Sequence, residues 1–103
     1  MKQVNQVTSS NKITYTVYVD ESKRNCQLTA TGSNFSIANG QENYQLTNVI
    51  PSTYRPQRNL FSFVSRSQYL FIYCWVNGTV GLVNWQGSSL SNQQCDCLIQ
   101  WSY

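Results

Sequence analysis

The sequence predicts an all-β protein, and three features of its composition support this. Val, Ile, Tyr, Phe, Trp and Thr, which suit the pleated, half-buried surface of a sheet, account for 36 of the 103 residues. Ala, Glu and Lys, which favour helices, account for only seven. Asn, Gln, Ser and Thr account for 43, yet the aromatic and β-branched side chains are numerous enough to offset the entropy of folding. The length fits a single domain, which we place at residues 12–103.

Strand signals follow one another through the first half of the chain. Residues 1–11 are polar with two isolated valines, and we expect a linker or a loosely held first strand there. From Lys12 to Asp20 apolar and polar residues alternate, which predicts a half-buried strand. Its apolar face carries Ile13, Tyr15, Val17 and Val19. The further elements expected before residue 51 are a polar turn over 20–25, a strand over 26–31, a turn at Gly32-Ser33-Asn34, a short strand over 35–38, a turn at Asn39-Gly40 and a strand over 44–50.

The segment from Pro51 to Pro56 is expected to be an ordered crossing loop, because a proline cannot donate a hydrogen bond to a sheet ladder. Pro56 favours an extended backbone at Arg55, whose five donors suit the carbonyl groups of a loop. We therefore expect Tyr54, Arg55 and Pro56 to have a structural role rather than a ligand role, since the segment would join two sheets. Four apolar strands are expected after it, over 60–65, 69–76, 79–85 and 97–103.

The dipeptide Asn77-Gly78 between two apolar runs predicts a β-hairpin with a two-residue turn. Trp75 would then face Val80, and Tyr73 would face Leu82. One face of the hairpin would carry Leu70, Ile72, Cys74, Val76, Val83 and Trp85, and the other would carry Phe71, Tyr73, Trp75, Val80 and Leu82.

Both faces of this hairpin are therefore apolar, although a two-layer sandwich covers only one face of each sheet. An uncovered second face would be a large apolar patch for a monomer. A symmetric partner subunit would cover it economically, and residues 98–103 could contribute to the contact. The alternative is a face that merely carries exposed aromatic residues, which are common on protein surfaces.

The four cysteines are expected to be buried free thiols. Cys26, Cys74 and Cys97 each lie in phase with apolar neighbours of a predicted strand, and a free cysteine packs as a small apolar residue. Two disulfides are the alternative, for a secreted protein. A zinc site would need all four thiolates because the chain has no histidine, and paired CxxC motifs are missing. We expect no metal and no cofactor.

The chemical inventory favours binding over catalysis. Histidine is absent, no pair of carboxylates is placed as a glycosidase dyad, and no glycine-rich phosphate loop occurs, so we expect no enzyme activity. The net charge of +3 is scattered, which does not favour nucleic acid, and no apolar run is long enough to insert in a membrane. The opening residues also lack the apolar core of a signal peptide. Abundant Tyr, Trp, Ser, Asn and Gln instead suit the recognition of sugars.

The segment Ile50-Pro51-Ser52-Thr53-Tyr54-Arg55-Pro56, the apolar run 69–76, Asn77-Gly78-Thr79-Val80 and an apolar last strand form a recognisable pattern. The chain resembles, over residues 12–103, the terminal receptor-binding domains of tail-fibre and baseplate proteins of tailed bacteriophages. Asn77 stands where an acidic residue is common in that pattern, and four cysteines exceed what the family leads us to expect.

The resemblance implies a jelly-roll-like antiparallel β-sandwich, assembled as a homotrimer, that binds bacterial surface polysaccharide during host adsorption. It implies a place at the tip of a phage tail in the virion, after folding in the host cytoplasm. We expect ligand contacts at loop edges, from Arg58, Arg66, Tyr69, Trp85 and Gln86, because Arg suits anionic polymers and aromatic rings stack on sugars. The alternatives are a structural trimerisation or virion decoration domain without ligand, and a small oligonucleotide-binding β-barrel.

Overall fold

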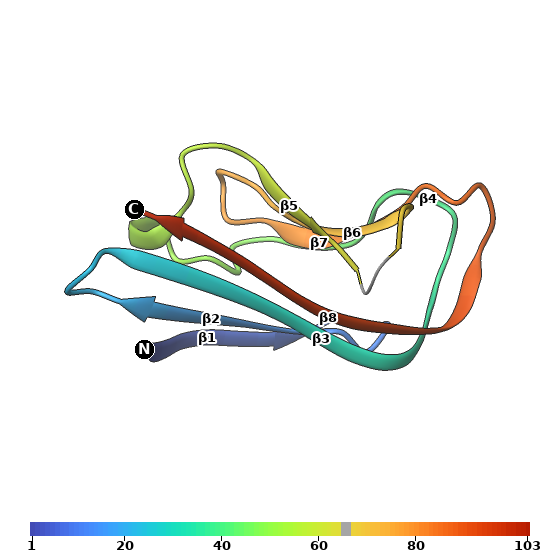
Figure 1. Ribbon diagram of the computed structural model, residues 1–103, viewed down its shortest axis with the longest axis horizontal. Helices are drawn as coiled ribbons and strands as arrows, with labels where there is room; N and C mark the ends of the chain where they lie inside the picture. Colours follow the sequence, from blue (N-terminus) through green and yellow to red (C-terminus); the bar gives the residue numbers. More distant parts are fainter. Residues whose placement is uncertain (65–66) are drawn as a thin grey trace.

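The computed structural model describes residues 1–64 and 67–103, with the backbone alone for residues 41–43. In this described part of the chain, eight strands form two four-stranded antiparallel sheets that lie one above the other (Figure 1). Apart from one short 3-10 turn, the described residues contain no helix. The prediction of an all-β antiparallel sandwich is confirmed. The strands are β1 Lys2–Thr8, β2 Thr14–Asp20, β3 Asn25–Ile37, β4 Gly40–Leu46, β5 Leu60–Phe63, β6 Leu70–Cys74, β7 Val80–Asn84 and β8 Leu90–Ser102, and the 3-10 turn spans Ser52–Tyr54.

The first sheet has the order β1-β2-β3-β8. Strand β2 buries Tyr15, Val17 and Val19 almost completely, and Ile13, directly before the strand, is buried with them, as the alternation predicts. Strand β1, within the segment expected to be a linker or a loose strand, pairs along its length with β2 and shows one register shift between Gln3 and Asn5.

The second sheet has the order β4-β7-β6-β5. Strands β5, β6 and β7 follow one another as hairpins, and β4 lies beside β7, which makes this sheet a Greek key. A jelly roll contains two Greek keys, whereas the first sheet here is a meander with β8 added beside β3. The sandwich therefore does not have the jelly-roll strand order that we expected. Its two separate sheets also differ from the closed barrel of the oligonucleotide-binding alternative.

The turn predicted at Gly32-Ser33-Asn34 is wrong, because β3 runs continuously from residue 25 to residue 37. The three residues form a bulge instead: the register with β8 shifts between Gly32 and Phe35, and Asn34 has a φ of 53°. Gly32 allows a close approach of the chain, since a Cβ there would lie 3.1 Å from the carbonyl oxygen of Lys12. The bulge bends the long strand at the point where turn residues interrupt its apolar alternation.

Both crossings between the sheets lie at one end of the sandwich, which we call the crossover end. There β3 leads into β4 and β7 leads into β8, on the right in Figure 1, while the two chain termini lie at the left. The fully buried amide of Asn84 joins the crossings: it donates to the carbonyl oxygens of Ala38 (3.3 Å) and Ser88 (2.9 Å) and accepts from the amide of Gln86 (2.9 Å).

The four cysteines are buried free thiols, as expected; the phase with apolar neighbours indicated this for Cys26, Cys74 and Cys97. Burial raises the pKa of the Cys26 and Cys74 thiols to about 12. The Cys95 thiol lies 3.8 Å from the Cys97 sulfur, and this contact, together with burial, raises the pKa of Cys95 further still. All four cysteines belong to the hydrophobic core, which consists mainly of side chains from the inner faces of the two sheets.

Candidate binding surface

The hairpin β6–β7 has a three-residue loop, so the predicted two-residue turn is wrong. The amide of Trp75 donates to the carbonyl oxygen of Thr79 (2.8 Å), and Cys74 pairs with Val80. The amide of Gly78 donates to the carbonyl oxygen of Trp75 (2.9 Å) with a φ of 84° at Gly78, the pattern of a turn followed by a left-handed glycine.

The loop before β5 fixes this turn. The amides of Val49 and Ile50 both donate to the carbonyl oxygen of Gly78, at 2.9 and 3.1 Å. A Cβ on Gly78 would lie 2.6 Å from the Arg55 Nε and from the Ile50 carbonyl oxygen, so only glycine fits. The register of the hairpin therefore depends on a contact with a distant loop.

The observed register of β7 against β6 differs by one residue from the predicted register, and this difference moves each β7 side chain to the opposite face of the sheet. Val80 and Leu82 lie in the core together with the β6 residues Leu70, Ile72 and Cys74. Val83 and Trp85 lie instead on the outer face, beside Phe71, Tyr73 and Trp75. The predicted membership of the faces is therefore wrong for β7, but both faces are apolar, as the hairpin argument requires.

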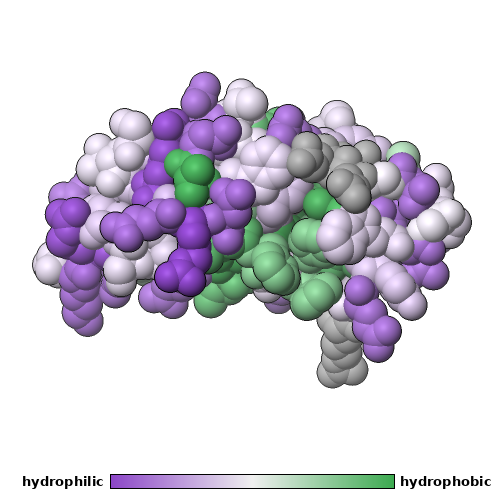
Figure 2. All heavy atoms as spheres, turned by 90° about the horizontal axis from the view of Figure 1, so that it is seen from above, coloured by the Kyte–Doolittle hydropathy of each residue, from purple (hydrophilic) through white to green (hydrophobic). Residues whose placement is uncertain are grey.

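The outer face of the second sheet forms a shallow cleft of about 400 Å³. Phe61, Phe63 and Trp85 are 62%, 52% and 56% exposed. Figure 2, which looks onto this sheet from above, shows hydrophobic side chains gathered over its middle and hydrophilic ones towards both ends. We call this surface the aromatic face; it consists of Phe61, Phe63, Phe71, Tyr73, Trp75, Val83 and Trp85, with the amide of Gln68 at its edge.

The rings of the aromatic face pack mainly edge to face. Phe71 lies 5.0 Å from Trp85 at 82° and 5.8 Å from Phe63 at 74°, and Phe61 meets Phe63 at 87°. Tyr73 is buried, and its ring covers Gly81 on β7, where a Cβ would collide with the Tyr73 hydroxyl. These rings therefore resemble one half of a hydrophobic core rather than a coplanar platform on which a sugar could stack.

The outer face of the first sheet is polar by contrast. The cross-strand rows pair Thr14 with Thr31 and Asp96, and Thr16 with Thr29 and Leu98. Leu98 is its one large apolar side chain that is more than half exposed among the described residues. The two outer faces of the sandwich are therefore chemically unlike.

The structure brings together three of the five residues predicted to contact a ligand. Tyr69, Trp85 and Gln86 lie at the crossover end, where the amide of Trp85 donates to the carbonyl oxygen of Tyr69 (2.9 Å). Arg66 lies outside the described residues. Arg58 is at the opposite end, where the neighbouring Asn59 accepts a hydrogen bond from the amide of Val76 (3.0 Å).

The loop over Tyr54, Arg55 and Pro56 connects β4 to β5, the two edges of the second sheet, rather than two sheets as predicted. Arg55 donates from Nε to the Ile50 carbonyl oxygen (2.9 Å) and from Nη2 to Asn48 Oδ1 (3.3 Å). The carbonyl oxygen of Tyr54 accepts from the indole of Trp101 (2.6 Å). These contacts give the segment a packing role.

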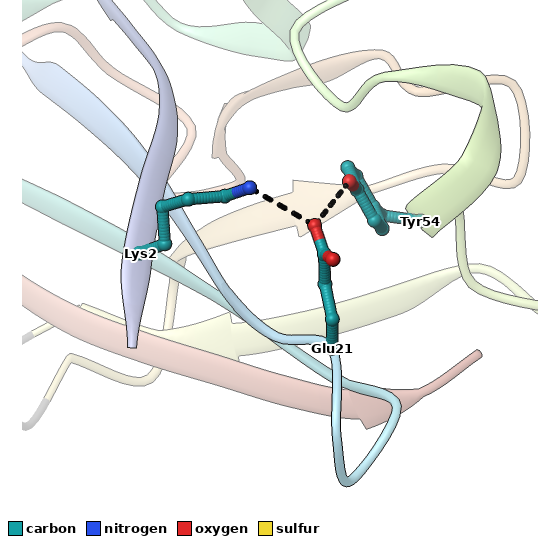
Figure 3. A network of polar contacts seen from close by, with 3 residues as sticks. All are labelled: Lys2, Glu21 and Tyr54. Atoms are coloured by element: carbon teal, nitrogen blue, oxygen red, sulfur yellow. Dashed lines mark hydrogen bonds and ion pairs between the residues drawn. The ribbon is translucent and has the colours of Figure 1, made fainter.

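A polar network ties the same loop to the start of the chain (Figure 3). Glu21 Oε1 accepts hydrogen bonds from Lys2 Nζ (3.0 Å) and from the Tyr54 hydroxyl (3.2 Å). Both contacts lower the pKa of Glu21, and the Lys2 hydrogen bond is the larger cause. All three side chains are solvent-accessible, so this surface ion pair and its hydrogen bond have only a small effect on stability.

Phe61 and Phe63 are the aromatic-face residues for which the sequence led us to expect no ligand or contact role. The alternation of phenylalanine and serine over 60–63 was a usable signal, since it places both Phe61 and Phe63 on one side of a strand.

The described part of the chain contains no cluster of three or more side chains that could hold a metal ion, and no helix in it is long and apolar enough to cross a bilayer. Comparison with protein-family models, with curated proteins and with solved structures finds no match to this chain.

Proposed function

We propose that this chain is a non-enzymatic receptor-binding domain of a bacteriophage tail, which assembles as a homotrimer and binds bacterial surface glycans. The observation that carries the proposal is the aromatic face. One sheet exposes a cluster of aromatic rings, whereas the other exposes a polar surface. Only the aromatic side of the domain is therefore suited to pack against another apolar surface.

The size of the aromatic face supports assembly. Each aromatic side chain offers 150–250 Å² for burial, so the exposed halves of Phe61, Phe63 and Trp85 present roughly 300 Å². A standard interface buries about 800 Å² on each partner, of which the central part is the most apolar. Phe61 and Phe63 would thus supply the centre of a contact between copies. Trp85, at the crossover end of the face, would lie at its rim together with the surrounding polar residues.

The two ends of the sandwich suit different tasks. A fibre shaft that continued from either terminus would leave from the end opposite the crossovers (Figure 1). The crossover end would then point towards the host, with Tyr69, Trp85 and Gln86 in reach of a glycan. Buried free thiols agree with folding in a reducing host cytoplasm. Each site would bind weakly, and several copies would provide useful adsorption by avidity.

Retention of a fluorescent fusion on a panel of bacterial cells tests this function. We expect binding to some strains, competition by their purified surface polysaccharide, and loss of binding with Trp85→Ala in a folded protein. A folded oligomer that is retained by no strain would contradict the glycan-binding function. That outcome would instead favour a structural trimerisation or decoration domain, which the same aromatic face supports.

A further inference from the structure

We propose that a hollow beside Tyr44 at the crossover end binds an anionic sugar, with its phosphate or carboxylate group held by Lys12. This inference rests on the proposed function and specifies a ligand class and a site for it. The hollow has a volume of about 380 Å³, and its lining includes Ser10, Asn11, Lys12, Asn34, Ser36 and Tyr44. Such a space holds a sugar ring, since small-molecule sites begin at roughly 300 Å³.

Three segments that are distant in sequence build this hollow. The β1–β2 turn is closed by the amide of Lys12, which donates to the Ser9 carbonyl oxygen (3.0 Å), and by the Ser9 hydroxyl, which donates to Asn11. Asn11 reaches from this turn to the bulged strand β3, where its Nδ2 donates to the Ser36 carbonyl oxygen (3.5 Å). Strand β4 contributes Tyr44.

Three residues that line the hollow have a left-handed backbone conformation, which is energetically unfavourable for most side chains. Lys12, Asn34 and Tyr44 have φ values of 73°, 53° and 57°, and they are three of the six described non-glycine residues in this left-handed region. Asn tolerates that conformation, but Lys and Tyr are disfavoured, and Gly or Asn would suit the turn better. Strained positions of this kind cluster at ligand sites, where the side chain is needed.

The chemistry of the hollow suits an anionic sugar. Lys12 is the one charged side chain among its described lining residues, and the Ser and Asn side chains offer hydroxyl and amide groups to sugar hydroxyls. The Tyr44 ring packs partly against the core and faces the hollow with the remainder. Lys12 and Asp96 both line a neighbouring hollow, but they do not form an ion pair. The ion pair found among the described residues is Lys2–Glu21. Asp96 therefore does not neutralise the Lys12 ammonium group by direct contact.

Titration of the purified domain with glucose phosphate, glucuronate and glucose, followed by amide NMR spectra, tests the site without cells. We expect glucose phosphate or glucuronate to shift the amide signals of residues 10–12, 34–36 and 44, and glucose to shift them far less. The two anions together show which acidic group is preferred. Lys12→Gln should lower the affinity at least about tenfold, as for a lost charge-assisted contact. The matched control Lys23→Gln, in the exposed β2–β3 turn at the other end, should bind as the wild type does.

A second variant distinguishes the effect of the Lys12 side-chain charge on binding from the effect of its backbone conformation on stability. Lys12→Asn should raise the melting temperature, because Asn tolerates the left-handed conformation, and should bind the anions as weakly as Lys12→Gln. Equal affinity for glucose, shifts elsewhere in the domain, or unchanged binding by either Lys12 variant would overturn the inference. Cell binding by the wild type that persists in both variants would overturn this site and leave the proposed function standing. Anion binding at the hollow without any binding to cells would instead support this site and contradict the proposed function.

Discussion

The replacement Asn84→Ala tests whether one buried amide holds the crossover end together. Asn84 is fully buried and makes three hydrogen bonds, to the carbonyl oxygens of Ala38 and Ser88 and from the amide of Gln86. Alanine would remove all three hydrogen bonds, and each of them contributes about 0.5–1.5 kcal/mol net to the free energy of unfolding. Partial rearrangement of the exposed residues 85–89 would reduce the total. We expect a loss of roughly 3 kcal/mol in the free energy of unfolding.

Thermal and urea unfolding, each followed by circular dichroism, measure this effect. For a domain of this size a loss of 3 kcal/mol corresponds to a fall of roughly 12–24 °C in melting temperature. The control Gln100→Ala removes an exposed amide from the polar outer face of the first sheet and should change stability by less than about 0.5 kcal/mol. An Asn84→Ala protein as stable as this control would refute the reasoning.

Three further outcomes are expected. Gly81→Ala should destabilise the domain by roughly 1–3 kcal/mol in urea unfolding, because the new methyl group displaces the Tyr73 ring; an unchanged midpoint would contradict that packing. Cys26 and Cys74, whose thiol pKa values rise to about 12, should resist alkylation in the folded protein at mildly alkaline pH and react in urea, as mass spectrometry would show; rapid labelling of the native protein would contradict their burial. Since the folded pKa of Glu21 is lowered, its small contribution to stability should be present above the ordinary carboxyl pKa and be lost as pH falls through the folded value; acid titration of Glu21→Gln should lack that step.

The strands were predictable where one face is buried and the other is wet. Along β2 and the residue before it, the alternation of Ile13, Tyr15, Val17 and Val19 alone identifies the core face. The β3 bulge was not predictable in the same way, because Gly32 and Asn34 are typical of turns and also of bulges. What decides between the two is the pairing of β3 with β8, a partner more than fifty residues later in the sequence.

The candidate surfaces were predictable in part for a similar reason. The apolar character of both hairpin faces follows from composition and does not depend on register. The positions of Val83 and Trp85 do depend on it, and the register is fixed by the contacts of Gly78 with Ile50 and Arg55. The hollow beside Tyr44 gave no signal in sequence, because three separate segments and their left-handed residues create it.

The central claim is that copies of this chain meet through the aromatic face, and sedimentation equilibrium of matched variants tests it most directly. Phe63 on that face and Leu98 on the polar face are each 52% exposed. The exposed half of Phe63 is roughly 100 Å², which is about 2.5 kcal/mol per copy when buried. At micromolar concentration we predict a trimer for the wild type and for Leu98→Ser, and dissociation for Phe63→Ser. A folded wild-type monomer, or equal masses for the two variants, would contradict the claim.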